Sequence, residues 1–221
     1  AAESADAEAG FVSLFNGKDL AGWDGNPDFW SARDGAIRGE TTAEKPTRGN
    51  TFCIWRGGTV EDFELRLSFR MRSGNSGIQY RSEDRGNWRV RGYQAEVANE
   101  PGRAGFLYDE GGRGRICLVG EKVVMDEEGK KQVVGSVGEL PAIKASFKLN
   151  DWNDYRIVAQ GNHLVHHVNG VQTIDFTDND PKGRSLSGIL ALQIHAGPPM
   201  VVEFKEIRLK AFPRPEAQPA P

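Results

Sequence analysis

Two polar side chains, Gln94 and Glu96, lie two residues apart in an otherwise apolar stretch of the sequence. Tyr93, Ala95 and Val97 alternate with them, which is the pattern of a β-strand with one apolar and one polar face. On such a strand the two polar side chains project from the same face, about 7 Å apart. An amide and a carboxylate placed in this way can bind hydroxyl groups, and the carboxylate can accept a proton.

A second polar face is expected on the segment from Phe63 to Arg81. Apolar residues at 63–71 alternate with polar ones, and the small residues of 73–77 predict a tight turn. Beyond the turn, Gln79 and Arg81 point to the side opposite Ile78 and Tyr80. We therefore expect an antiparallel hairpin whose polar face suits a hydroxylated ligand.

Composition narrows the class of protein. The chain has 221 residues and a formal net charge of -3, which argues against nucleic acid or an anionic membrane as the main partner. No apolar run approaches the roughly 18 residues of a membrane span. The 27 glycines and 11 prolines favour many short strands joined by turns over long helices.

The remaining strands follow from alternation and turn residues. Residues 30–37 predict a hairpin around Asp-Gly, and 152–170 predict a meander with a turn at Asn-Gly. Residues 51–55 are short and apolar, and we expect them to pair with the strand that begins at Phe63. Residues 188–195 and 201–209 predict two final strands.

The region 109–148 has the weakest pattern. We expect long, exposed connections around one or two short strands, such as 116–119, because charges and glycines dominate there. Together the segments predict an all-β fold, a jelly-roll β-sandwich of two antiparallel sheets.

The ends of the chain predict segments outside the folded domain. Residues 1–9 are small and acidic, as expected of a disordered N-terminal segment after signal cleavage in an exported (periplasmic or extracellular) protein. Residues 213–221 predict a Pro-rich disordered tail, which leaves 10–212 as one domain. Cys53 and Cys117 allow one disulfide and no disulfide framework.

A series of short motifs in order resembles the family of 3-keto-disaccharide hydrolase domains, formerly called domain of unknown function 1080. The resemblance covers about residues 10–212 and is carried by Gly10-Phe11, Leu14–Leu20, Gly22-Trp23, Phe69-Arg70, Gly74–Ile78 with Arg81, Gly92-Tyr93, Trp152-Asn153, Asn169-Gly170, Gly188-Ile189, Leu192–His195 and Val202–Ile207.

The resemblance implies a concanavalin-A-like jelly roll, usually exported in bacteria, that acts on glycosides whose glucose unit is oxidised at C3. One motif differs. Family members commonly have Gly-Tyr-Glu-x-Gln in the central strand, whereas Gly92 is followed by Tyr93, Gln94, Ala95 and Glu96. The carboxylate is thus displaced by about 7 Å along the same face of the strand.

The implied chemistry requires three kinds of group. A ketone at C3 acidifies the C2 proton, so the glycosidic bond can break by elimination followed by addition of water. Glu96 and His195 are our candidates for base and acid, and Arg81 for the group that holds the enolate oxygen. A divalent metal bound by Glu96 and His195 is an alternative electrophile, although the sequence has no dense ligand motif.

Further side chains are expected to orient a carbohydrate ligand by hydrogen bonds or stacking. These substrate-binding candidates are Gln94, Gln193, Gln79, Asn75, Tyr108 and Trp88.

Each candidate also has a purely structural interpretation. Glu96 and Arg81 can form a cross-strand ion pair, and His195 can be satisfied by backbone at the end of its strand. Asn75 is explained by turn chemistry, and the aromatic residues by core packing.

Two alternative functions remain open. The fold is also found in non-catalytic carbohydrate-binding, lectin-like modules. A glycanase with two carboxylates is less favoured, because no second acid with same-face spacing accompanies Glu96.

Overall fold

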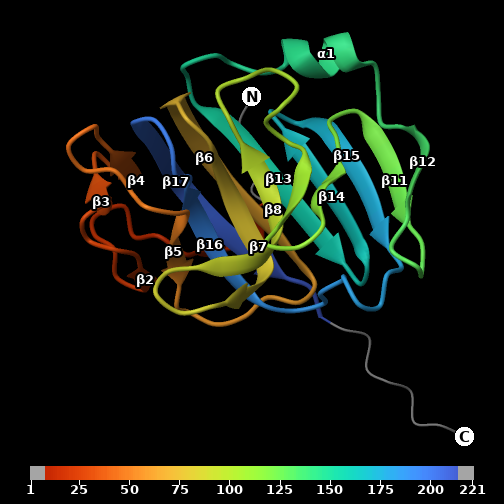
Figure 1. Ribbon diagram of the computed structural model, residues 1–221, viewed down its shortest axis with the longest axis horizontal. Helices are drawn as coiled ribbons and strands as arrows, with labels where there is room; N and C mark the ends of the chain where they lie inside the picture. Colours follow the sequence, from red (N-terminus) through yellow and green to blue (C-terminus); the bar gives the residue numbers. More distant parts are fainter. Residues whose placement is uncertain (1–7, 214–221) are drawn as a thin grey trace, which may run out of the picture.

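The chain folds into two β-sheets that lie face to face, with one short helix, α1 (Leu140–Ala145), at one end of the sandwich (Figure 1). The computed structural model describes residues 8–213.

The larger sheet has ten strands in the order β12-β11-β15-β14-β13-β6-β17-β4-β3, with β1 beside β17. Their bounds are β1 (Val12–Ser13), β3 (Trp30–Arg33), β4 (Ala36–Thr41), β6 (Phe63–Ser73), β11 (Glu121–Met125), β12 (Lys131–Ser136), β13 (Asn153–Gln160), β14 (His163–Val168), β15 (Val171–Asp178) and β17 (Met200–Ala211).

The smaller sheet has seven strands in the order β10-β9-β8-β7-β16-β5-β2. Their bounds are β2 (Trp23–Asp24), β5 (Thr51–Trp55), β7 (Ser76–Asp84), β8 (Val90–Val97), β9 (Leu107–Glu110), β10 (Gly114–Cys117) and β16 (Ile189–Ile194).

The core lies between the two sheets and is built from alternate residues of each strand. From β6 the larger sheet contributes Leu65, Leu67 and Phe69, and the smaller sheet contributes Tyr80 and Tyr93, all of them buried. The alternation read from the sequence therefore assigned the buried face of these strands correctly. Gln94 and Glu96, which alternate with Tyr93, lie on the outer face of the smaller sheet.

The predicted all-β sandwich is confirmed, and so are the hairpin β3–β4 and the meander β13–β15. Within residues 8–213, every strand pair is antiparallel except β11 with β15, which is parallel. The final strands 188–195 and 201–209 correspond to β16 and β17.

The pairing of two segments was predicted wrongly. β6 and β7 do not form a hairpin, because the turn between them carries the chain from the larger sheet to the smaller one. β5 pairs with β16 and β2 rather than with β6. Alternation is a local property of the sequence, whereas the sheet that a strand joins depends on contacts far along the chain.

The region 109–148 is more ordered than predicted. In place of one or two short strands it holds β10, β11, β12 and α1, together with the end of β9. All six residues of β12 are exposed, so this edge strand has no apolar face for a pattern to reveal.

The β7–β8 hairpin bends over the outer face of its own sheet. Tyr80 pairs with Tyr93 and Glu83 with Arg91, so Arg81 and Ser82 together oppose the single residue between 91 and 93. Such a bulge bends the strand and raises its twist. In Figure 1 the yellow tip of the hairpin accordingly reaches the orange strand β5.

The bent tip is fixed by packing and hydrogen bonds. Val90 packs on Phe52, Ile54 and Ala191 of the sheet beneath, and the backbone N–H of Phe52 donates to the carbonyl of Trp88. The hairpin is therefore a wall that stands on the outer face of the sheet.

The chain ends and the two cysteines differ in part from what the sequence predicted. Residues 1–7 and 214–221 lie outside the described part, but Glu8, expected in the disordered segment, forms ion pairs with Arg66 and Arg208. Cys53 and Cys117 are both free and buried, so the disulfide does not form. Within residues 8–213, no helix is long and apolar enough to cross a membrane.

Candidate functional site

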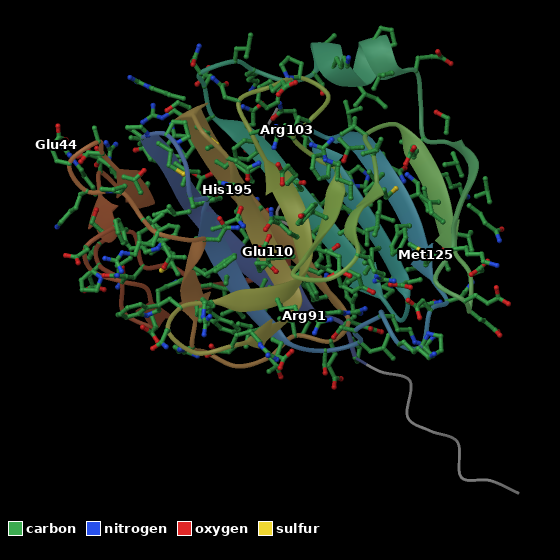
Figure 2. The ribbon with its side chains drawn as sticks, viewed as in Figure 1. Glu44, Arg91, Arg103, Glu110, Met125 and His195 are labelled. Atoms are coloured by element: carbon green, nitrogen blue, oxygen red, sulfur yellow. The ribbon has the colours of Figure 1, made fainter. Side chains whose placement is uncertain are left out.

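A pocket of about 290 Å³ opens on the outer face of the smaller sheet. Its lining is mostly polar and consists of Asn50, Asn75, Gln94, Glu96, Arg103, Phe106, Tyr108, Glu110, Arg115 and His195. Figure 2 shows Arg103, Glu110 and His195 grouped on this face of the molecule.

Glu96 is the buried carboxylate of the pocket, with 2% of its surface exposed. Its Oε1 accepts from Asn75 Nδ2 at 2.6 Å and from Arg103 Nε at 3.1 Å, and Gln94 Nε2 donates to its Oε2 at 3.0 Å. Burial raises the pKa of Glu96, and these hydrogen bonds and the charge of Arg103 oppose that rise. A carboxylate with a raised pKa is a stronger base than an exposed glutamate.

A glycine makes room for this arrangement. Gly77 on β7 lies directly opposite Glu96, and a methyl group at Gly77 would clash with the side chain of Gln94. The absent side chain allows Gln94 to lie over β7 and to reach the carboxylate. Gly77, predicted as a turn residue, thus lies in β7 and makes room for a side chain that lines the pocket.

The three predicted glutamines occupy different depths. Gln94 lines the pocket, while Gln79 and Gln193 are fully buried beside it. The Gln79 amide lies 2.7 Å from Gln94 Oε1, and Gln193 Nε2 donates to Glu110 at 3.4 Å. Gln79 therefore supports Gln94 from below.

Glu110 is a second carboxylate that the sequence analysis missed. Asn50 Nδ2 donates to its Oε1 at 2.9 Å. Glu110 pairs with Gly92 at the bend of the hairpin, so the bend carries it over the sheet towards Gln193. Spacing along the strand of Glu96 gave no second acid, because Glu110 lies on the neighbouring strand β9. The usable signal was its position two residues after Tyr108, on the same face of β9.

His195 lies at the mouth of the pocket, exposed, just after β16. Its Nδ1 lies 2.6 Å from the carbonyl of Ala196. Because a carbonyl only accepts, Nδ1 donates to it, and Nε2 stays open to a ligand. The backbone thus fixes the ring without occupying the nitrogen that can react.

Arg81 does not join Glu96 and His195, so the predicted meeting of these three side chains is corrected. Arg81 is 1% exposed, and its guanidinium donates to Asp62 and to the carbonyls of Glu61 and Gly161. Arg81 has a φ of 47° at the bulge, which breaks the alternation on which the prediction relied. Arg103, from the β8–β9 connection, is the cation beside Glu96 instead.

The two aromatic candidates separate. Tyr108 lines the pocket as expected. Trp88 does not, because it lies at the tip of the hairpin, where its Nε1 donates to Asp24 at 2.7 Å. Phe106 and Arg115 were not predicted; Arg115 belongs to the region 109–148, in which the sequence pattern was weak, and Phe106 lies in the connection just before β9.

Two acceptor oxygens of the site have no hydrogen-bond partner. Asn75 Oδ1 and Gln193 Oε1 are both buried and unpaired. Buried polar atoms are nearly always paired in native proteins, and an unpaired one costs about 1–3 kcal/mol. Asn75 lines the pocket, so a ligand that brings a hydroxyl donor there would satisfy its oxygen.

The predicted divalent metal is not supported by a cluster of ligand side chains in the described residues. Among residues 8–213, no group of three or more His, Cys, Asp or Glu side chains lies close enough together to hold a metal ion. A divalent ion bound by Glu96 and His195 would need amide oxygens or water to complete its coordination. The metal therefore stays a prediction.

Comparison with known proteins places the chain in a family. A sequence model of the 3-keto-alpha-glucoside-1,2-lyase-like domain matches residues 10–210. The chain belongs to this family, and the resemblance predicted from its motifs is confirmed. No curated protein matches the chain.

Solved structures show the same fold. Two proteins from Parabacteroides distasonis ATCC 8503, each described as a candidate glycosyl hydrolase, share 20% and 17% identity with TM-scores of 0.60 and 0.63. The matches cover 91% and 96% of this chain and 99% of each of those proteins.

The carbohydrate-binding module CBM66 from Bacillus subtilis shares 14% identity over 91% of this chain and 96% of its own, with a TM-score of 0.50. At such identities these likenesses establish the fold alone, a jelly-roll β-sandwich.

Proposed function

We propose that this protein cleaves the glycosidic bond of 3-keto-glucosides or 3-keto-disaccharides in the pocket around Glu96. The observation that carries the proposal is a buried carboxylate of raised pKa paired with an arginine. It lies beside buried amide oxygens that have no partner in the protein. Membership of a family described as 3-keto-alpha-glucoside-1,2-lyase-like supports the same reaction.

The first step is removal of the C2 proton by Glu96. The electron pair of the C2–H bond forms the enolate with the C3 ketone, and its return expels the C1 oxygen with formation of a C1–C2 double bond. The departing oxygen takes up a proton from water, while the proton removed from C2 stays on Glu96 and returns to C2 when the resulting hydroxide adds to C1. Addition of water to C1 then gives the free 3-keto-sugar, so that the overall reaction is a hydrolysis.

Arg103 and His195 stand on either side of this base. His195 follows β16, and Arg103 lies in the connection between β8 and β9, so the two approach from opposite directions in the strand order. One faces the C3 oxygen, where negative charge develops, and the other faces the departing oxygen. Asn75 and Gln94 orient hydroxyl groups, and Tyr108 stacks on the sugar ring.

The second candidate function is carbohydrate binding without catalysis. The polar lining, the glutamine amides and Tyr108 would serve a lectin-like module equally well. A binding module does not require a titratable group that is buried and shifted, which is why we favour the enzyme.

The test compares 3-keto-trehalose with trehalose. Release of 3-keto-glucose and glucose is followed by NMR, and binding of both sugars by calorimetry. The proposal predicts turnover of the keto-sugar alone. Binding of unoxidised sugars with no turnover of any keto-sugar would assign a carbohydrate-binding module. Hydrolysis of trehalose that needs both Glu96 and Glu110 would assign a two-carboxylate glycosidase.

A chelator arm tests the metal. Activity that survives the chelator assigns the electrophile to Arg103 and His195, whereas activity lost and restored by a divalent ion assigns it to the metal.

A further inference from the structure

A second groove of about 320 Å³ continues from the candidate site. The two share Arg103, Phe106 and Arg115, so a ligand that passes over these residues occupies both. The groove lies between the β8–β9 connection, the segment after β10, and α1. Its other lining residues are Glu100, Gly102, Leu118, Val119, Leu140 and Lys144.

The groove has exposed apolar walls. Leu118 and Leu140 are 40% and 41% exposed, although leucines on a protein surface gain from being covered. Phe106 and Val119 pack together beneath them in a small cluster separate from the main core. A flat apolar group between these walls would bury part of both leucines.

The groove is also positively charged. Arg103, Arg115 and Lys144 line it against the single carboxylate of Glu100. Arg115 lies over the ring of Phe106 at 5.6 Å. Among the described residues, no carboxylate forms an ion pair with Arg115 or Lys144. Two cations are therefore available for an anionic ligand.

We propose that this groove binds the leaving group of the substrate, and that it favours an aromatic leaving group that carries a carboxylate. This rests on the proposed function. Leu118, Leu140 and Phe106 contact the ring, and Arg115 and Lys144 contact the carboxylate. Only the C1 side of an oxidised terminal glucose carries a large substituent, so the groove marks the direction of C1.

The orientation of the sugar follows. With C1 towards the groove, Arg103 lies nearest the departing oxygen. The C3 oxygen then points the other way, towards His195. Glu96, between the two, faces C2.

The test uses two aryl 3-keto-glucosides that differ only in charge. Their phenols carry a 2-carboxyethyl or a 2-carbamoylethyl group in the para position, so the phenols are similarly good leaving groups. We expect kcat/KM to favour the carboxylate by about tenfold at low salt, since several partly exposed cations contribute modestly each. Added salt should reduce the preference.

Variants locate the charge effect. Lys144→Gln should lower the preference about threefold, by the typical effect of one exposed charge. Lys148→Gln removes the same charge just beyond α1, outside the groove, and should leave the preference as in the wild type. Equal kcat/KM for the two glycosides, or equal effects of the two variants, would overturn the proposal while leaving the proposed function intact.

A binding arm separates this inference from the reaction itself. The free phenol, 3-(4-hydroxyphenyl)propionate, is titrated calorimetrically into wild type and Lys144→Gln without any keto-sugar. Weaker binding to the variant supports the groove even if no glycoside is turned over. No binding to the wild type, or the same affinity for both proteins, refutes it.

Discussion

Arg103 Nε donates to Glu96 Oε1 across 3.1 Å, from a connection that begins just beyond the strand carrying the carboxylate. The arginine is about a third exposed, whereas the carboxylate is almost fully buried. A buried base thus has a partly solvated cation beside it, and the cation can turn towards a ligand without unfolding any strand.

Replacement of Glu96 should abolish turnover without loss of the fold. We expect Glu96→Gln to lower kcat by roughly 10²–10⁴-fold, the usual contribution of a positioned acid or base. Glutamine keeps the shape and can still accept from Asn75. Glu110→Gln is the matched control, and its effect should be on KM. If Glu96→Gln turns over 3-keto-trehalose as fast as the wild type, Glu96 is not the base.

The activity should fall on acidification at a higher pH than an ordinary glutamate would give. Burial raises the pKa of Glu96, so its basic form is lost sooner as the pH drops. A pH profile of kcat/KM checks this through the midpoint of its acidic limb.

The raised pKa of Glu96 also affects the stability of the fold. Whereas the activity should increase as the pH rises, the contribution of Glu96 to stability should decrease. A carboxyl whose pKa is higher in the folded state stabilises the fold below its unfolded pKa, about 4.3, and loses that contribution as the pH rises through the folded value. Glu96→Gln should therefore gain melting temperature relative to the wild type between acidic and neutral pH. A gap that is constant or shrinks with pH would contradict the raised pKa.

The two arginines should respond differently to substitution. Arg103→Gln should lower turnover about tenfold or more while the melting temperature changes little, because this side chain is partly exposed. Arg81→Gln should instead lower the free energy of unfolding by about 3 kcal/mol, because the buried guanidinium loses its ion pair with the partly exposed Asp62 and its hydrogen bonds to two backbone carbonyls. Thermal melts and kinetics of both variants separate the two roles.

A methyl group at Gly77 should damage the site and spare the sandwich. Gly77→Ala displaces Gln94, which removes one donor from Glu96, and we expect affinity for the keto-sugar to fall by about tenfold. Gly135→Ala, on the exposed strand β12, is the control. Calorimetric titration and melting curves of both variants test this; unaltered affinity in Gly77→Ala would show that Gln94 does not contact the ligand.

The thiols should be inert in the folded protein. Burial raises the pKa of both Cys53 and Cys117 to about 12, so almost no thiolate is present near neutral pH. We expect negligible alkylation by iodoacetamide until denaturant is added, then two labelled thiols by mass spectrometry. Reductant should leave the melting temperature unchanged.

The structural features that the sequence predicted correctly are those that depend on residues close together in the chain. Alternation along β6, β8 and β16 assigned their buried faces correctly, and it placed Glu96 and Gln94 together on an outer face. It did not reveal that β6 and β7 lie in different sheets, since the residues that pair with each are far away in the chain.

The site residues that were missed depend on departures from regular structure. The bulge at Arg81 and Ser82 removes Arg81 from the predicted face and swings Glu110 over the sheet. Arg103 lies in a connection with no periodicity at all. Such residues are brought to the site by the three-dimensional path of the backbone, which a local sequence pattern does not show.

The bent hairpin ties the site to a part of the chain that supplies no reactive group. Arg56 forms ion pairs with Asp24 and Asp84, and Asp24 also accepts a hydrogen bond from Trp88. The tip of the β7–β8 hairpin is therefore held to β2 and to the end of β5. Loss of these contacts would shift the hairpin and with it Glu110, which pairs with Gly92, while the proposed catalytic side chains stayed unchanged. Natural variation near Asp24 and Arg56 thus offers a way to tune substrate choice from a distance, and its mark would be altered specificity in enzymes whose reactive residues are identical.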